Sequence, residues 1–131
     1  MQKREYLKGD KRQQERGYSP AVKTRGGTTI YLAGYGGFED ESGKTYSGDF
    51  DAQVRVVFER MRKTLERAGS SLDDIVTMTV FITDMANGTR FTQLRKEVFK
   101  EGRYPASALI GIKALARPEM MIEIQAIAVV D

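Results

Sequence analysis

The sequence has no cysteine and no histidine, and these absences restrict the chemistry available to it. Without cysteine it cannot form a disulfide framework, a thiolate nucleophile or a cysteine-based metal site. Without histidine, serine–histidine and cysteine–histidine catalytic systems are excluded. A zinc or iron site would need carboxylates alone, which those metals rarely use. We therefore expect no metal site, and proton transfer is left to Asp, Glu, Lys, Tyr and bound water.

The sequence also lacks an apolar run long enough to cross a bilayer, and its first residues are polar where a signal peptide would need an apolar segment. Both features favour a cytoplasmic protein without membrane contact. Its 21 basic and 18 acidic residues are spread along the chain and give a net charge of +3, which is typical of a mixed surface and makes a nucleic-acid partner unlikely. A chain of 131 residues fits one domain.

The first sixteen residues differ in composition from the rest. Lys, Arg, Glu and Gln predominate there, and Tyr6 and Leu7 are the only sizeable apolar side chains after the initiator. Such a stretch buries too little apolar surface to offset the entropy of ordering it. We expect a flexible basic and polar arm over residues 1–16 and a single domain over residues 17–131. The alternative is an arm that docks as a strand or helix on a partner subunit.

Patterns typical of strands and helices begin at Tyr18. The pair Gly26-Gly27 separates two strand-like runs and predicts a hairpin, because glycine takes positive φ freely. Apolar residues at helical spacing predict helices over 49–69 and 91–102. Residues 75–83 alternate as a half-buried strand does. Residues 106–115 and 121–130 indicate two further strands, buried and neighbouring, with a turn at Pro118 between them.

This order of elements gives an α+β fold in which two helices cover one face of a sheet. The opposite face would then carry apolar residues that no helix covers, among them Leu109, Ile127 and Val129. Another copy of the chain is the available cover. We therefore expect a homo-oligomer.

Several segments together resemble the Rid/YjgF (reactive-intermediate deaminase) family. They are Tyr18-Ser-Pro-Ala-Val22, Ala33-Gly34, Asp73–Ile75 with the strand after it, Tyr104-Pro-Ala106 and Ile122-Glu-Ile-Gln-Ala-Ile-Ala128. The resemblance implies a chorismate-mutase-like mixed sheet of five to six strands with two helices on one face. It also implies a homotrimer with small-molecule clefts between subunits. Family enzymes hydrolyse reactive enamines and imines such as 2-aminoacrylate to a keto acid and ammonia, without a metal or other cofactor.

One position departs from the family pattern. The deaminase-competent branch has an arginine directly after Pro-Ala, where it pairs with the substrate carboxylate, and this chain has Ser107 there. A serine hydroxyl is uncharged and cannot form a bidentate pair, so a carboxylate ligand would lose a charge-assisted contact. The resemblance therefore predicts a substrate that differs from 2-aminoacrylate. Arg90, Arg95 and Arg103 could supply the charge, but each reads as a solvated residue, and Arg103 is the best of them because it is nearest to Pro105.

The resemblance also assigns roles to other residues. Glu123 stands where the family has the glutamate that positions the attacking water, and an unpaired carboxylate within an apolar strand fits that role. The alternative is that Glu123 pairs with a basic side chain or hydroxyl at a subunit interface. The substrate-binding candidates, which include Ser107 as a hydrogen-bonding wall residue, are Ser107, Gly34, Tyr35, Tyr18, Thr92, Leu109 and Arg103.

Three functions follow in order of preference. The first is metal-free hydrolytic deamination of an enamine, imine or related small molecule at an inter-subunit cleft. The second is a non-catalytic trimer that binds a small-molecule ligand, which the loss of the hallmark arginine favours. The third is a ribonuclease-like activity, described for some family members, although the sequence lacks an aromatic-interleaved basic patch.

Overall fold

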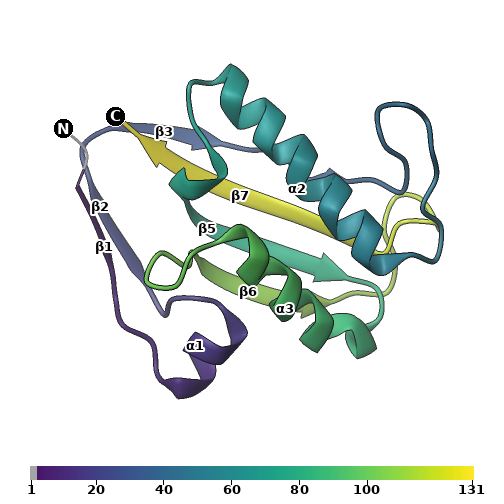
Figure 1. Cartoon of the computed structure of the whole chain (residues 1–131), viewed down its shortest axis with the longest axis horizontal. Helices are drawn as coiled ribbons and strands as arrows, with labels where there is room; N and C mark the ends of the chain where they lie inside the picture. The colour runs from purple at the N-terminus through teal and green to yellow at the C-terminus, as the bar shows by residue number, and fades with distance from the viewer. Residues whose placement is uncertain (1–2) are drawn as a thin grey trace.

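A mixed five-stranded sheet forms the centre of the protein in the computed structural model, which describes residues 3–131 (Figure 1). Helices α2 and α3 both lie across one face of this sheet, as the sequence predicted. The elements in chain order are β1 (Lys3–Tyr6), α1 (Lys11–Arg16), β2 (Val22–Arg25), β3 (Thr28–Tyr31), β4 (Tyr35–Gly36), α2 (Phe50–Arg67), β5 (Ile75–Ile82), α3 (Gly88–Val98), β6 (Ala106–Gly111) and β7 (Ile122–Val130), with short 3-10 turns at Leu72–Asp74 and Met85–Asn87.

The strand order is β3-β7-β5-β6, with β4 beside β7. β7 runs antiparallel to its three neighbours, whereas β6 runs parallel to β5, so that α3 serves as the crossover connection. The expectation that the last two strands are neighbours is therefore wrong, because β5 lies between them. The expectation that both are buried is wrong for β6, which is an edge strand with exposed residues. A local turn at Pro118 does not fix which strands pair, since the chain crosses the end of β5 before it enters β7.

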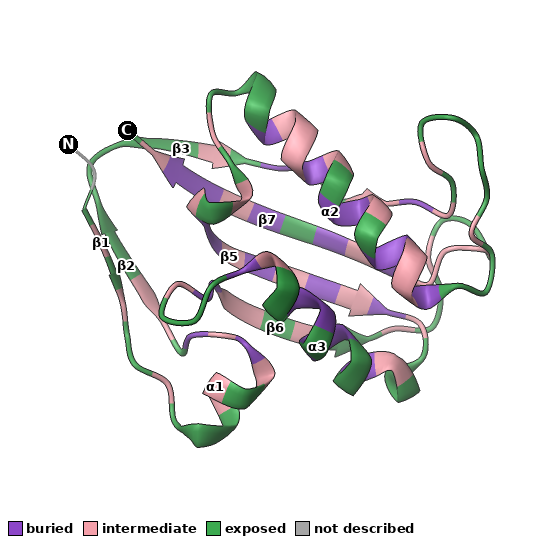
Figure 2. Cartoon of the chain, in the orientation of Figure 1, coloured by how far each residue is buried: buried purple, intermediate pink, exposed green. Residues whose placement is uncertain are grey.

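Helix α2 shows why the helical face of the sheet is well packed. The Asp49 side chain accepts a hydrogen bond from the backbone N–H of Ala52 and so caps the helix at its first turn. One stripe of the helix is buried against the sheet, in agreement with the predicted spacing (Figure 2). The ring of Phe58 packs edge-on against Phe99 and stacks with Phe91 of α3, which joins the two helices.

The other face of the sheet carries side chains that no helix covers. Tyr31 is 75% exposed there, and Ile127 is half-buried. Two of the three apolar residues expected on this face behave differently. Leu109 is in register with the core residue Val80, so it lies on the helical face. Val129 is buried within the single chain and needs no second copy to cover it.

The predicted hairpin around Gly26-Gly27 is also wrong in its pairing. β2 pairs with β1, and β3 pairs with β7, so the two glycines link separate sheets. Both glycines do have positive φ, which accounts for their presence at this sharp change of direction. The error arose because a turn signal gives the position of a bend and not the partners of the strands beside it.

The structure places regular elements within the segment expected to be a flexible arm. Strand β1 and helix α1 fall within residues 3–16, while residues 1 and 2 of that segment lie outside the described residues. Asp10 and Gln13 form a capping box at the start of α1. Helix α1 is short and has no buried residue. The sequence therefore has no apolar pattern there that would predict a helix.

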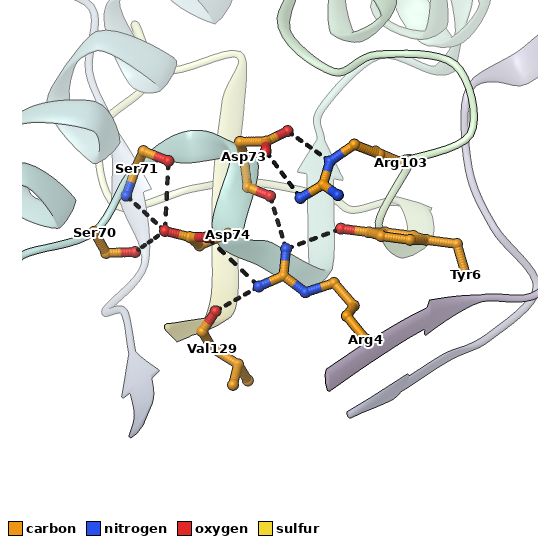
Figure 3. Close-up of polar contacts among 8 residues, drawn as sticks. All are labelled: Arg4, Tyr6, Ser70, Ser71, Asp73, Asp74, Arg103 and Val129. Atoms are coloured by element: carbon orange, nitrogen blue, oxygen red, sulfur yellow. Dashed lines mark hydrogen bonds and ion pairs between the residues drawn. The ribbon is translucent and has the colours of Figure 1, made fainter. Parts of the chain in front are cut away.

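Arg4 connects β1 to the main domain (Figure 3). Its side chain is 7% exposed, and its guanidinium donates to the backbone carbonyls of Asp73 and Val129 and contacts the Asp74 carboxylate at 3.5 Å. It also donates to the hydroxyl of Tyr6 at 3.0 Å. Polar contacts with the domain thus hold a segment that lacks an apolar stripe.

Candidate functional site

The carboxylate of Glu123 lies on the open face of the sheet. Glu123 is in register with Phe81 of β5 and with Gly36 of β4. The position of Gly34 leaves room for it, since a Cβ atom added to Gly34 would lie 2.8 Å from Oε2 of Glu123. Within residues 3–131, Glu123 has no hydrogen bond and no ion pair. We call Glu123 and Gly34 the Glu123 face.

A second group of candidate residues surrounds Arg95 of α3. The guanidinium donates from Nη1 to the hydroxyl of Ser107 at 3.0 Å and from Nε to the carbonyl of Arg16 at 2.9 Å. It lies 5.4 Å from the ring centroid of Tyr18 and 5.3 Å from that of Phe91. We call Arg95, Ser107, Tyr18 and Phe91 the Arg95 cluster.

The chain before β2 holds this cluster in place. Arg16 is the last residue of α1, and its carbonyl points to Arg95. Ser19 follows as a parallel bridge to Ala106, with its hydroxyl bonded to the carbonyl of Tyr104 at 2.6 Å. The segment around Tyr18 therefore runs along the free edge of β6. This arrangement brings Tyr18 and Ser107, two predicted site residues, to the same guanidinium.

Arg95 is unusual among the arginines because it is buried without a carboxylate. It is 2% exposed, and no ion pair to it occurs within residues 3–131. Burial and the nearby charge of Arg16 lower the pKa of Arg95 to about 10, partly opposed by Tyr18. The expectation that Arg95 is a solvated helix residue is therefore wrong. Arg95 follows Phe91 by four residues, which places it on the apolar stripe of α3, and this spacing was the available signal.

Two further candidates lie on the same face of the sheet as Ser107. Thr92 is 3% exposed, and its hydroxyl donates to the carbonyl of Thr89 at 2.7 Å. Leu109 follows Ser107 by two residues on β6 and packs against the core. Thr92 is thus three residues before Arg95 on α3, and Leu109 is two residues after Ser107 on β6.

The remaining candidates lie elsewhere. The Tyr35 hydroxyl donates to Thr64 of α2 at 2.6 Å, on the helical face and away from Glu123. Arg103 forms an ion pair with Asp73 at 2.9 Å, beside Tyr6 (Figure 3 shows this end of the molecule). Arg90 pairs with Asp51 on the surface. The two arginines thus have acidic partners, and neither joins the Arg95 cluster or the Glu123 face.

The Glu123 face and the Arg95 cluster are separate within one chain. β7 and β6 have β5 between them, a spacing of about 10 Å. Ser107 is in register with the buried Met78 and Glu123 with Phe81, so the two side chains lie on opposite faces. A hollow of about 460 Å³ lies instead between α2 and the loop around Asp40, and its lining includes neither group. One copy of the chain therefore does not bring the candidates into one pocket.

Neither a metal centre nor a membrane segment is found in the part of the chain that the structure describes. Residues 3–131 contain no cluster of three acidic side chains that could hold an ion. No helix among them has both the length and the apolar character that a bilayer requires.

Comparisons with known proteins identify the family. The model of the family described as Endoribonuclease L-PSP matches residues 10–130. A RutC family protein of Pyrococcus abyssi is 33% identical over 111 residues, which cover 85% of this chain and 84% of that protein. The RutC family protein YjgH of Escherichia coli is 32% identical over 111 residues, covering 84% and 82%.

Solved structures agree with this result. The Rid family protein YyfB of Yersinia pestis superposes with a TM-score of 0.84 at 26% identity, covering 97% of this chain and 98% of that one. RidA of an Antarctic Psychrobacter species has a TM-score of 0.72 at 34% identity, covering 86% and 88%. The chain therefore belongs to the Rid/YjgF family, whose family model carries the description Endoribonuclease L-PSP.

Proposed function

We propose that this protein is a cytoplasmic, metal-free deaminase that hydrolyses a reactive enamine or imine in a cleft between subunits of a homotrimer. The proposal depends on one observation, the unpaired carboxylate of Glu123. Its carboxylate has no hydrogen bond or ion pair within residues 3–131 and faces Gly34, where no side chain blocks it. An unpaired carboxylate on a strand is available as a general base.

The chemistry needs one base and no cofactor. Glu123 takes a proton from a water molecule while the water oxygen attacks the carbon of the C=N bond. Glu123 then passes that proton to the nitrogen, which gives a neutral carbinolamine. Glu123 next takes the hydroxyl proton of the carbinolamine and delivers it to the same nitrogen as the C–N bond breaks, so that ammonia leaves, a carbonyl compound remains and Glu123 is ionised again. An enamine first tautomerises to the imine. Donors near the reacting nitrogen and oxygen would stabilise the charge that develops on them.

The trimer supplies the missing half of the cleft in this proposal. The Glu123 face and the Arg95 cluster lie on opposite faces of one chain, so they can meet only when the open face of one subunit approaches the β6 edge of another. The exposed Tyr31 and the half-buried Ile127 on the open face support such an interface.

Imine hydrolysis can be measured directly. With 2-aminoacrylate generated in situ by a dehydratase, or with another small imine, stopped-flow absorbance should decay faster in the presence of the protein. Glu123→Gln should slow the catalysed phase by about 100-fold, because general-base catalysis is removed. Glu66→Gln, which weakens only a surface ion pair with Arg62, should leave the rate unchanged. No acceleration with any imine tested would contradict the proposal.

A second candidate function is a non-catalytic trimer that binds a small molecule. It is favoured by the Arg95 cluster, whose polar side chains offer hydrogen bonds and charge but no group that would transfer a proton at neutral pH. In that case ligand binding would persist while imine hydrolysis stayed at the uncatalysed rate. Ribonuclease activity has less support, because Tyr31 is the only strongly exposed aromatic side chain in the described part of the chain.

A further inference from the structure

The hollow of about 460 Å³ beside α2 takes no part in the proposed reaction, and we call it the α2 hollow. One of its walls is a face of α2 within residues 52–63, and the other is the loop over residues 40–46. A hollow of this volume can hold a small organic molecule. Because α2 covers the helical face of the sheet (Figure 1), a subunit interface on the open face would leave the α2 hollow accessible.

Hydrogen bonds hold the loop wall in place. The Asp40 carboxylate accepts from the backbone N–H groups of Ser42 and Lys44 at 2.9 and 3.0 Å. It also accepts from the hydroxyls of Ser42 and Tyr46 at 2.6 and 3.0 Å. These bonds, that from the Ser42 hydroxyl first, lower the pKa of Asp40, so this carboxylate stays ionised. The wall that carries Tyr46 is therefore formed before any ligand binds.

Arg60 gives the α2 hollow a positive charge that no carboxylate neutralises. Its Nη1 donates to the carbonyl of Gly36 at 3.0 Å. A Cβ atom added to Gly37 would lie 3.1 Å from the same Nη1, so the guanidinium packs against backbone that has no side chain. Arg60 is half-buried and forms no ion pair within residues 3–131, where its Nε and Nη2 also have no hydrogen bond. The guanidinium is thus fixed in position with two groups of donors unused.

The acidic side chains around the α2 hollow already have partners. Glu41 pairs with Lys63 at 2.6 Å, and Glu59 pairs with Arg62 at 2.7 Å. The hydrogen bond from Arg62 lowers the pKa of Glu59, so this group also stays ionised. Carboxylates at the rim repel a ligand that carries two or more negative charges. A single negative charge can pair with Arg60 at a smaller electrostatic cost.

Apolar groups line the rest of the α2 hollow. Tyr46, Ala52 and Val56 belong to its lining, and all three are half-buried. The tyrosine comes from the loop, and the other two residues lie one helical turn apart on α2. An aromatic ring opposite aliphatic groups suits the body of a flat ligand.

We infer that the α2 hollow binds a flat organic acid with a single carboxylate, which pairs with Nε and Nη2 of Arg60. A planar guanidinium matches the two oxygens of a carboxylate, and the apolar lining contacts the rest of the molecule. The inference goes beyond the proposed deaminase reaction, because neither Glu123 nor the Arg95 cluster lines the α2 hollow.

Three probes with the same ring test this inference on the full-length protein. Benzoate has one negative charge, benzamide has none, and phenyl phosphate has more than one at neutral pH. Calorimetry should show that the wild type binds benzoate at least about tenfold more tightly than either of the others, because only benzoate gains a charge-assisted contact without added repulsion. In NMR titrations with benzoate, the backbone amide signals of Tyr46 and Val56 should shift.

Two variants change the α2 hollow in different ways. Arg60→Met should weaken benzoate binding by roughly 10- to 100-fold and remove the preference over benzamide. Ala52→Leu keeps Arg60 and fills the hollow with a larger side chain, so it should weaken the binding of both probes. Arg67→Met is the matched control, since Arg67 lies on the exposed end of α2 and does not line the hollow. It should bind benzoate as the wild type does.

Several results would overturn the inference. They are no saturable binding of benzoate to the wild type, equal or tighter binding of benzamide or phenyl phosphate, unchanged benzoate affinity in Arg60→Met, and amide shifts confined to Glu123 or the Arg95 cluster. Circular dichroism shows whether Arg60→Met folds. If it does not, Ala52→Leu decides, and unchanged affinity there contradicts the site. Binding is measured without turnover, so failure of the deaminase proposal leaves this inference standing, and the converse also holds.

Discussion

Arg95 of helix α3 donates a hydrogen bond of 3.0 Å to the hydroxyl of Ser107 on strand β6. The resemblance of the Tyr104-Pro-Ala106 segment predicts that Ser107 stands where the deaminase branch of the family carries an arginine, and here a guanidinium from a different element lies beside Ser107. We expect the stability of the protein and its tolerance of substitutions at position 107 to depend on this pair.

The buried charge of Arg95 should reduce stability at neutral pH. We expect Arg95→Met to leave the free energy of unfolding unchanged or to raise it by about 1–2 kcal/mol, because methionine fills the space without a desolvated charge. Urea denaturation of both proteins measures the difference. A loss of several kcal/mol in Arg95→Met would show that the guanidinium is primarily structural.

The same pair of proteins should respond differently to alkaline pH. The pKa of Arg95 is about 10 in the folded protein, below its usual value, so the unfolded state holds this proton more tightly. Wild-type stability should therefore rise relative to Arg95→Met as the pH increases through about 10. Denaturation curves near neutral pH and above pH 10 test the sign, and an increasing advantage of Arg95→Met would contradict it.

Ser107→Arg should be harmful in the wild type and tolerated when Arg95 is removed. Two guanidinium groups would compete for the same buried space, which should lower the free energy of unfolding by about 2–4 kcal/mol. In Arg95→Ala, the new arginine should cost little, because the space and the hydrogen-bond acceptor of the lost guanidinium are then free. A double-mutant cycle of unfolding free energies measures this coupling, and additive effects would show that the two positions do not interact.

Gly34 should be required for the position of the Glu123 carboxylate. A Cβ at Gly34 would lie 2.8 Å from Oε2, so Gly34→Ala must displace the end of the Glu123 side chain. We expect imine hydrolysis to fall at least about tenfold, with a loss of stability below about 1 kcal/mol. Gly88→Ala is the control, since its φ is −60° and its nearest neighbour to an added Cβ is 3.5 Å away. Full activity of Gly34→Ala would show that Gly34 is not needed to position the Glu123 carboxylate.

The open face of the sheet should form the subunit interface. A charge at Ile127 would be buried without a partner in an assembled trimer, so Ile127→Asp should shift the protein toward its monomer mass of 14.7 kDa. Light scattering after size exclusion gives the mass directly. Arg67→Asp, on the exposed end of α2, should retain the wild-type mass. An unchanged mass for Ile127→Asp would place the interface elsewhere.

Local patterns in the sequence predicted much of this fold. Both helices on one face and the strand 75–82 follow from apolar spacing, because each pattern is set by residues close in the chain. Strand pairing was predicted poorly. Gly26-Gly27 indicated a bend, but β2 and β3 join different sheets. The last two strands are separated by β5, since pairing depends on the crossover through α3.

The candidate site was predicted only in part for a related reason. Tyr18 and Ser107 do meet, through contacts between segments almost ninety residues apart, while the guanidinium that joins them was taken for a solvated side chain. Composition alone cannot reveal that Arg95 is buried, because a single arginine within an apolar stripe can also extend its charged end to water. The docked segment 3–16 has no apolar stripe, so polar contacts such as those of Arg4 had no sequence signal.

Mixing two inactive variants tests the central claim most directly, namely that the Arg95 cluster of one subunit and Glu123 of another form one active site. Glu123→Gln and Arg95→Met should each lack imine hydrolysis as separate trimers. After co-refolding in equal amounts, roughly a quarter of the sites in a random mixture should combine two intact halves and regain activity. If mixed trimers form, as native mass spectrometry would show, and remain inactive, the two groups do not share a site across the interface.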